Sequence, residues 1–309
     1  MIVINEDFNK KLDKNTFIAL GSFDGIHLGH LSLINKVVSL AKEKDFYSMV
    51  FTFKNHPLSL IDKNKVPKLI MNNNYKLDIL DILDVDIACL RTFDKSLMEL
   101  SPEDFILMLI EKYNMKGVVV GFNYRFGYKN LGDITLLKRL SEKYNFKLVV
   151  IDAFKYNSEV VSSTRIREAL KDGKVEEAMK MLSKPYMVQG KVVMGRQIGR
   201  EIGFPTANLE LDDRYLIPKI GVYYTNIKWN NEIFKGITSI GHNPTVEGKK
   251  LTIETYILNF NKNIYNDELK LYFIERIRDE KKFNSIEDLK IQLIKDKNVA
   301  KERKIMINI

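Results

Sequence analysis

Alternation between apolar runs and helical patterns is the feature that most restricts the fold of residues 1–150. Helical patterns at 28–44 and 103–113 separate runs that are apolar almost throughout. The apolar runs are TFIAL, YSMVFTF, DIACL, GVVVG and KLVVI. Such runs are typical of parallel strands whose sheet is covered by helices on both faces. The sequence therefore predicts an α/β domain whose ligands bind at the carboxyl ends of the strands.

The pattern changes near Pro185. A helical stretch at 164–182 is interrupted by Asp172 and Gly173 and stops before this proline, which cannot continue a helix. Beyond it, strand-like segments separated by turn residues predict a small antiparallel barrel, followed by a last helix capped by Ser285. The helix should present Ile286, Leu289 and Leu293 on one face. A chain of 309 residues favours two domains, which we expect at 1–183 and 186–309.

Composition excludes several classes of protein. Hydrophobic residues make up 45% and charged residues 29%, as in ordinary globular chains. No segment approaches the roughly 18 apolar residues of a membrane span, and the N-terminus has no signal-peptide pattern, so we expect a cytoplasmic protein without membrane contact. The lysines behind the net charge of +9 are scattered, which favours a solubility role. Cys89 lies in an apolar run and is expected to be a buried core thiol.

A glycine-punctuated turn, GSFDGIHLGH at 21–30, follows the first apolar run and opens into a helix. Glycines let the backbone approach phosphate closely, and a helix N-terminus offers free N–H groups and a positive dipole. His27 and His30 lie on one helical face and can donate hydrogen bonds to the same charged group. Taken alone, they could also be helix caps or metal ligands. No third histidine or cysteine is near in sequence to complete a zinc site.

A second segment with phosphate-binding chemistry is VSSTRIR at 161–167, again at a strand-to-helix transition. Its hydroxyl groups can contact phosphate oxygens, and its guanidinium groups can bind them bidentately. Considered by itself, the segment is equally consistent with a helix N-cap followed by solvated arginines.

The C-terminal half contains a glycine-rich, basic loop at 195–203 that runs into a proline-fixed turn, PTAN at 205–208. Glycines spaced by four expose backbone N–H groups as phosphate loops do, although no Walker A sequence occurs in the chain. For the glycines alone, a mobile hairpin loop explains the pattern better. Glu254 lies in a later strand-like segment, where an isolated glutamate usually faces solvent.

In combination, these motifs resemble the bacterial bifunctional riboflavin kinase/FAD synthetases, from about Ile18 to the C-terminus. The pairing of HxGH with SSTRIR is similar to the HxGH nucleotidyltransferases, TFKNHP and GFNYRFG follow in the order of the bifunctional family, and PTAN is a flavokinase signature. The resemblance implies a Rossmann-like nucleotidyltransferase domain followed by a β-barrel flavokinase domain. It also implies that riboflavin is phosphorylated to FMN, and that FMN is adenylylated to FAD, with ATP as co-substrate.

The resemblance further implies roles for individual residues. Catalytic roles fall to His27, His30 and Arg167 in adenylyl transfer and to Glu254, as proton acceptor, in the kinase reaction. Thr206 and Asn208 are expected to hold Mg²⁺. ATP and its phosphates are expected at Gly21, Phe23, Asp24, Gly25, Ser163, Thr164, Gly195, Arg196, Gly199, Gly203 and Pro205. The flavin side is expected at His56, Pro57, Asn123 and Arg278. For Asp24 a structural role in the turn is equally compatible, and for His56 and Pro57 a plain turn is nearly so.

Two features depart from the family pattern. Asn259 stands where an aspartate is usual, and Asn266 stands where a glycine is common. They bear on local turn geometry and not on the chemistry.

Parts of the sequence are compatible with two other functions. An HxGH transferase for another substrate, such as a pantetheine-phosphate or nicotinate-mononucleotide adenylyltransferase, would leave the PTAN motif unexplained. A basic nucleic-acid-binding protein would require basic and aromatic residues interleaved on one surface. We therefore expect small-molecule partners and no nucleic acid, while the sequence makes no prediction of oligomeric state.

Overall fold

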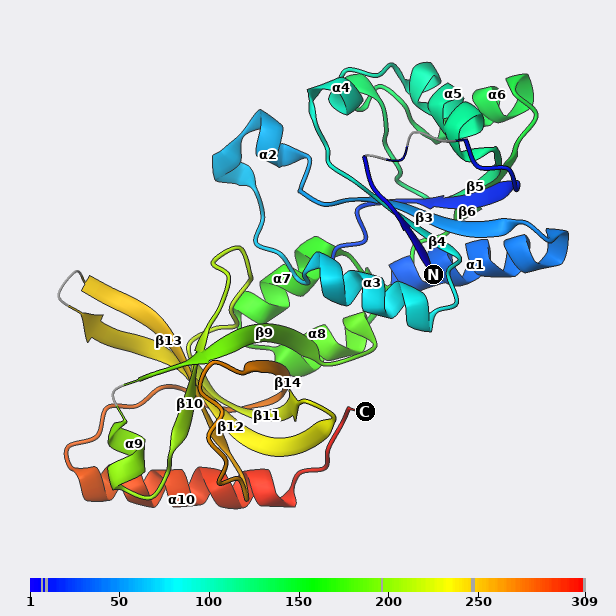
Figure 1. Ribbon diagram of the computed structural model, residues 1–309. Coiled ribbons are helices and arrows are strands. Elements are labelled where there is room, and N and C mark those ends of the chain that lie inside the picture. Colours follow the sequence, from blue (N-terminus) through cyan, green and yellow to red (C-terminus); the bar gives the residue numbers. More distant parts are fainter. Residues whose placement is uncertain (7, 9–10, 196, 246–247, 308–309) are drawn as a thin grey trace. The chain divides into compact units, whose positions relative to one another are not determined.

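The computed structural model describes residues 1–6, 8, 11–195, 197–245 and 248–307. The chain divides into two compact units (Figure 1). The first consists of Met1–Lys68 and Asn72–Ser162, and the second of Leu69–Met71 and Ser163–Ile309. The region of alternating strands and helices and the strand-rich region therefore belong to different units.

A six-stranded parallel sheet forms the centre of the first unit, in the order β1-β4-β3-β2-β5-β6. The strands are β1 (Ile2–Ile4), β2 (Thr16–Leu20), β3 (Tyr47–Phe53), β4 (Ile87–Arg91), β5 (Met115–Gly121) and β6 (Lys147–Ile151). All five residues of β2 are buried, as expected for a central strand covered on both faces. The predicted parallel α/β architecture is confirmed. Strand β1 was not predicted, because three residues are too few to show a pattern.

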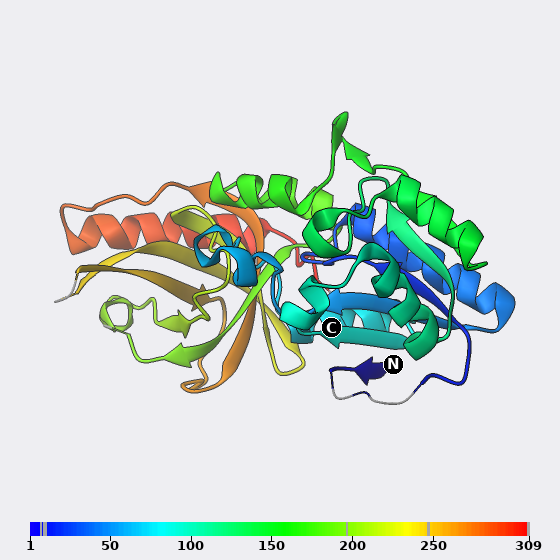
Figure 2. The same cartoon turned by 90° about the horizontal axis from the view of Figure 1, so that it is seen from above.

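Helices cover both faces of this sheet (Figures 1 and 2). On one face, α5 (Pro102–Tyr113) and α6 (Ile134–Lys143) pack on a core that includes Ile18 and Phe51. On the other face, α1 (Leu28–Lys44) packs against β2 and β3. The remaining elements of the unit are α2 (Leu58–Ile61), η1 (Lys63–Lys65), α3 (Asn73–Ile82), α4 (Lys95–Met98), η2 (Tyr128–Asn130), β7 (Lys155–Tyr156) and β8 (Glu159–Val160).

The single cysteine lies in the core, as predicted. Cys89 on β4 is fully buried and free, with its Sγ atom 3.6 Å from the hydroxyl oxygen of Tyr113. Burial raises the pKa of the Cys89 thiol to about 11. The thiol is therefore protonated at neutral pH and behaves as a small apolar side chain.

The second unit is built on a closed barrel in which every neighbouring pair of strands is antiparallel, in the order β10-β13-β12-β11-β14-β9. The strands are β9 (Tyr186–Val193), β10 (Thr206–Glu210), β11 (Gly221–Trp229), β12 (Glu232–Thr245), β13 (Gly248–Ile257) and β14 (Glu268–Arg278). The predicted barrel is confirmed. The expected turn at PTAN needs correction, because only Pro205, which lacks an N–H to donate, precedes the strand that starts at Thr206.

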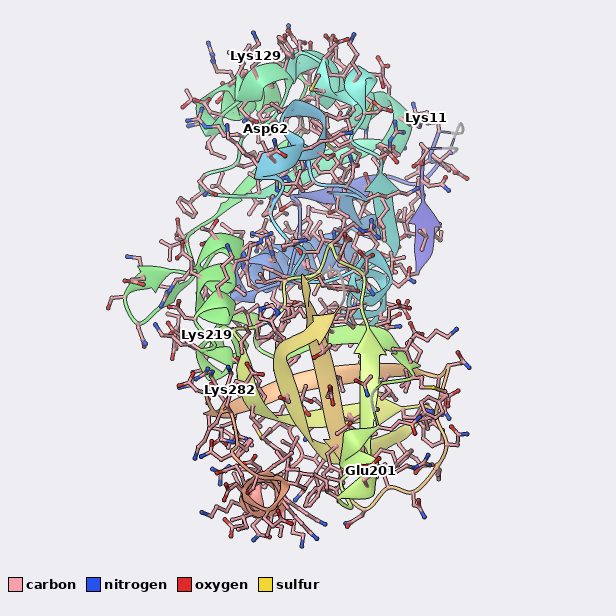
Figure 3. The ribbon with its side chains drawn as sticks, turned by 90° about the vertical axis from the view of Figure 1, so that its left-hand side faces the viewer. Lys11, Asp62, Lys129, Glu201, Lys219 and Lys282 are labelled. Carbon is pink, nitrogen blue, oxygen red and sulfur yellow. The ribbon has the colours of Figure 1, made fainter. Side chains whose placement is uncertain are left out.

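Four helices accompany the barrel: α7 (Ser163–Lys171), α8 (Val175–Leu182), the short α9 (Ile198–Glu201) and α10 (Ile286–Glu302) (Figures 1 and 3). Gly173, with a φ of 79°, separates α7 from α8 at the predicted interruption. Ser285 caps α10 as predicted, its side chain accepting the Asp288 N–H at 3.1 Å. The expected apolar face is only partly buried, since Ile286 is 58% exposed and the helix buries Asp296 instead.

The two asparagines that depart from the family pattern both have left-handed backbone conformations. The φ angle is 55° at Asn259 and 70° at Asn266. Asparagine tolerates this region better than most residues, so Asn266 fills a position that suits glycine without disturbing the turn.

No helix in the described part of the chain is long and apolar enough to cross a membrane.

Candidate active sites

The turn between β2 and α1 is conformationally strained. Phe23, Gly25 and Ile26 have φ angles of 48°, 91° and 36°, and the side chains of Phe23 and Ile26 are fully buried. A positive φ is unfavourable for residues with large side chains, so packing must hold the turn in this conformation. Asp24, between them, is 8% exposed. Strain of this kind, held by a surrounding core, is common at functional sites.

His27 is the N-cap of α1. Its Nδ1 atom accepts the His30 N–H at 3.3 Å, and the two imidazole rings stack with centroids 3.7 Å apart. The spacing thus brings the rings together as expected, and the capping alternative also holds for His27. Because Nδ1 is an acceptor, a neutral His27 carries its proton on Nε2, which is the donor left for a ligand.

Both histidines are neutral at pH 7. Burial lowers the pKa of His27 to about 4. The pKa of His30 also lies well below its usual value, first because its ring is enclosed by protein and then because His27 and Lys76 are near. An anion placed against these rings would favour their protonated forms and raise both pKa values. The pair is therefore suited to a site that is filled by a phosphate group.

A cavity of about 440 Å³ opens beside this turn. It lies at the carboxyl ends of the parallel strands, as expected for a ligand site in such a sheet. Five of the predicted site residues line it, namely Gly21, His27, His30, Pro57 and Asn123. Its aromatic wall consists of Phe51, Phe53, Phe93, Phe105, Phe122, Tyr124, Phe126 and Phe154. A concave aromatic wall with few polar groups suits a planar ring system.

Asn55 joins two loops of the cavity wall, a role that the TFKNHP segment did not predict for it. Its Oδ1 atom accepts the Phe93 N–H at 2.8 Å, while its Nδ2 donates to the Phe93 carbonyl at 3.0 Å and to the Ser59 hydroxyl at 2.9 Å. Next to it, His56 accepts the Leu58 N–H through Nδ1 at 3.1 Å, which is the plain turn role left open for this residue. Asn55 therefore fixes the loops after β3 and β4 to each other.

The other predicted phosphate ligands of the N-terminal half are not among the residues that line this cavity. Phe23, Asp24 and Gly25 form the buried part of the strained turn. Ser163, Thr164 and Arg167 are on α7, which belongs to the second compact unit.

In the second unit, β10 and β13 bring three predicted residues together. The Thr206 hydroxyl donates to Glu254 Oε2 at 3.3 Å, and Asn208 is the direct cross-strand partner of Glu254. Side chains two residues apart on a strand share a face, so all three lie on one face of the barrel wall. Hydroxyl, amide and carboxylate oxygens are the hard ligands that Mg²⁺ prefers. The donor set therefore fits this ion.

The glycine-rich loop packs tightly against the polar cluster. A Cβ atom on Gly195 would lie 2.2 Å from Asn208 Nδ2, and one on Gly199 would lie 2.3 Å from the Phe204 carbonyl oxygen. Gly203 has a φ of 83°, which an L side chain rarely adopts. Arg196 lies outside the described residues.

A cavity of about 560 Å³ reaches this cluster at Thr206, whereas Asn208 and Glu254 are not among its lining residues. Its lining includes Pro205 and Thr206 from the PTAN segment, together with Gln197 and Arg200 near α9 and Lys262 after β13. Cationic and amide side chains thus line the same cavity as Thr206. This arrangement is suited to a polyanionic ligand.

Arg278, predicted on the flavin side, is engaged in a buried ion pair. Its Nη2 donates to Asp296 at 2.8 Å and its Nε to both Asp296 oxygens at 3.1 Å. Asp296 is only 1% exposed and also accepts from Gln292 Nε2 at 2.8 Å. The pair attaches α10 to the end of β14. The sequence does not predict this role for Asp296, because an aspartate on a charged helix resembles a surface residue.

Two family models match this chain, FAD synthetase over residues 9–165 and riboflavin kinase over residues 182–304. A protein of Listeria monocytogenes named bifunctional riboflavin kinase/FMN adenylyltransferase is 38% identical over 286 residues, which cover 92% of this chain and 91% of the relative. A protein of the same name from Buchnera aphidicola subsp. Schizaphis graminum is 35% identical over 299 residues and 95% of both chains.

Among solved structures, one described as a macrolide-efflux protein from Streptococcus pneumoniae is 31% identical, with a TM-score of 0.91 over 98% of this chain and 100% of that one. The family matches fall on both halves, and the named relatives are matched over nearly their full length. The chain therefore belongs to the bifunctional riboflavin kinase/FMN adenylyltransferase family.

Proposed function

We propose that this chain phosphorylates riboflavin to FMN with ATP and then transfers AMP from a second ATP to FMN, giving FAD and pyrophosphate. The observation that carries the proposal is the presence of two cavities in two compact units, the first lined by His27 and His30 and the second by Pro205 and Thr206 of the PTAN segment. We assign adenylyl transfer to 1–183 and the kinase to 186–309. This assignment gives α7 and α8 to the first activity, although they pack in the second unit. We place the enzyme in the cytoplasm.

In the kinase reaction, Glu254 would accept the proton of the riboflavin 5′-hydroxyl as the hydroxyl oxygen attacks the γ-phosphorus of ATP and ADP leaves. Thr206 and Asn208 would hold Mg²⁺, which supplies neutralisation of phosphate charge when bound. Gly195, Gly199, Gly203 and Pro205, together with Arg196, would shape the loop over the phosphates. The Thr206–Glu254 hydrogen bond supports this assignment, because it keeps the carboxylate beside the phosphate-binding end of β10.

In adenylyl transfer, an FMN phosphate oxygen would attack the α-phosphorus of ATP directly, and pyrophosphate would leave. No covalent enzyme intermediate is needed when both reactants are aligned. His27 Nε2–H and His30 would donate hydrogen bonds to the charge that develops on the α-phosphate. Ser163, Thr164 and Arg167 would bind phosphate oxygens. The isoalloxazine ring would occupy the aromatic cavity, with Asn123, His56 and Pro57 at its side and Arg278 serving the flavin of the kinase site.

Chromatography of flavins tests this proposal. Purified protein is incubated with riboflavin, ATP and Mg²⁺, and we expect FMN to appear first and FAD to follow. A parallel reaction without Mg²⁺, in chelator, should leave riboflavin unchanged. Nicotinate mononucleotide and phosphopantetheine replace FMN in separate reactions to test the rival adenylyltransferases. Unchanged riboflavin with Mg²⁺ present, or adenylylation of a rival substrate in preference to FMN, would refute the proposal.

A further inference from the structure

Lys76 is a buried lysine beneath the histidine turn. It lies on α3 and is only 4% exposed. Its Nζ donates to the Ser22 carbonyl at 3.1 Å and lies 3.4 Å from the Thr52 hydroxyl oxygen. A lysine is rarely buried to this degree unless its charge is compensated, because removing an ammonium group from water is costly. The reactions proposed above give Lys76 no role that would account for this burial.

The contacts of Lys76 converge on one peptide unit of the strained turn. The Ser22 carbonyl accepts from Lys76 and also from the Thr52 hydroxyl at 2.8 Å, while the Gly21 N–H donates to Phe51 at 3.3 Å. The chain has no cis peptide bond in its described part, so the Phe23 N–H points to the side opposite the Ser22 carbonyl. Anchoring this carbonyl from below thus fixes the direction of an N–H at the phosphate-binding turn.

The charge of Lys76 acts on the same place. The ionisable groups that influence it or are influenced by it are Asp24 in the turn and His30 on α1. Burial lowers the pKa of Lys76 to about 8, and Asp24 acts in the opposite direction. At pH 7 the ammonium group is therefore mostly charged. The Asp24 carboxylate offsets part of this charge, but Lys76 still lowers the pKa of His30, so its positive field reaches the histidine pair and would attract an incoming polyphosphate.

We propose that Lys76 is a positioning residue for adenylyl transfer, whose buried ammonium group holds the Ser22 carbonyl and supplies positive charge under the phosphate-binding turn. The inference rests on the proposed adenylyl transfer at this cavity. It assigns Lys76 no contact with substrate: the lysine acts through the turn and through its field on His30 and the bound phosphates.

Lys76→Met, which keeps an unbranched side chain but removes the charge, tests the proposal against Lys76→Arg, which keeps the charge. Lys36→Met, at an exposed position on α1, is the matched control for net charge. FAD formation from supplied FMN is measured from pH 6.5 to 9.5, with FMN formation from riboflavin as the internal control. We expect kcat/KM for FAD formation to fall at least about tenfold in Lys76→Met and less in Lys76→Arg, with kinase turnover and Lys36→Met unchanged.

The pH profile separates this role from simple support of the fold. In the wild type, kcat/KM for FAD formation should decline as pH rises through about 8, because the free enzyme loses the ammonium charge. In Lys76→Arg this decline should disappear, since arginine stays charged. Wild-type activity without an alkaline decline, or equal FAD formation in folded Lys76→Met and wild type, would overturn the inference. If wild type makes no FAD at all, the proposed function fails instead.

Discussion

The two candidate sites are built in opposite ways. In the first unit, His27, His30 and Lys76 are enclosed by protein, and burial lowers the pKa of each group. In the second, Thr206, Asn208 and Glu254 are only half-buried on a barrel wall, where a hydroxyl and a carboxylate are hydrogen-bonded at 3.3 Å. Enclosed hydrogen-bond donors suit transfer between two large anions, whereas an accessible carboxylate suits deprotonation of an alcohol.

The two sites also differ in what makes them rigid. The first relies on a strained turn held by buried Phe23 and Ile26, so its geometry depends on the core. The second relies on strand register, because Asn208 faces Glu254 across two hydrogen-bonded strands. Changes at either site should therefore leave the chemistry of the other intact.

Removal of the histidine pair should inactivate the first site, and this is the largest effect that we expect. In His27→Ala/His30→Ala, FAD formation from FMN should fall at least about 1,000-fold, because donors to the developing phosphate charge are lost. FMN formation from riboflavin should continue, so FMN accumulates. Both rates are read from one flavin chromatogram. Continued FAD synthesis by this variant would remove the histidines from the mechanism.

Removal of the carboxylate should break the second site. Glu254→Gln should lower FMN formation by about 100-fold or more, since the amide cannot accept the proton of the attacking hydroxyl. FAD formation from supplied FMN should stay within about twofold of the wild type, as transfer at the other site needs no Glu254. Glu210→Gln, at an exposed position on β10, is the matched control. Loss of both activities in a folded Glu254→Gln protein would contradict independent sites.

Low pH should lower the free energy of unfolding of the first unit through His27. The folded-state pKa of His27 lies at about 4, below the unfolded value near 6.5, so the unfolded chain binds more protons between these values. The contribution of His27 to the free energy of unfolding is fully present above pH about 6.5. It is lost as the pH falls toward 4, and the total loss is about 3 kcal/mol. His27→Asn, which can still cap α1, should show a weaker dependence.

Calorimetry from pH 7 to 4.5 measures this effect. We expect the unfolding transition of the first unit to move to lower temperature as the pH falls, and to move less in His27→Asn. The same acid sensitivity in wild type and His27→Asn would show that His27 is not the titrating group.

Substitution of Asn55 should have the smallest of the expected effects on FAD formation. Asn55→Asp removes the two donated hydrogen bonds to Phe93 and Ser59 while keeping the shape of the side chain. We expect the KM for FMN to rise about fivefold with kcat nearly unchanged, which corresponds to about 1 kcal/mol, a typical value for a lost hydrogen bond. Steady-state kinetics of FAD formation gives both constants. A drop in kcat at constant KM would place Asn55 in the chemical step instead.

Sequence patterns predicted the architecture well where they were long. The seven-residue run at 47–53 and the helical pattern at 28–44 correspond to β3 and α1 with the same limits. Short elements such as β1 and α9 give too little pattern to detect. The PTAN segment looked like a turn because of its proline, yet the strand pairing with β13 begins one residue later.

The sites could be predicted only where a motif marks chemistry. The histidine spacing predicted that the two side chains lie on the same side, and the structure places them together, although His27 is the N-cap of α1 and its ring stacks on that of His30. Asn55 lies within the TFKNHP segment, but that segment does not indicate a contact with Phe93. Lys76 and Asp296 have no such signature, because each appears in the sequence as an ordinary polar residue. Their importance comes from tertiary burial, which brings Lys76 under Ser22 and Asp296 against Arg278. Local pattern carries no information about such contacts.

Mixing the two inactivated proteins tests the central claim of two separate active sites most directly. Glu254→Gln and His27→Ala/His30→Ala are combined with riboflavin, ATP and Mg²⁺, and each is also assayed alone. We predict that neither variant alone makes FAD from riboflavin, while the mixture does, because FMN made by the second protein is used by the first. A mixture that yields no FAD, although each variant retains its remaining reaction, would contradict the account.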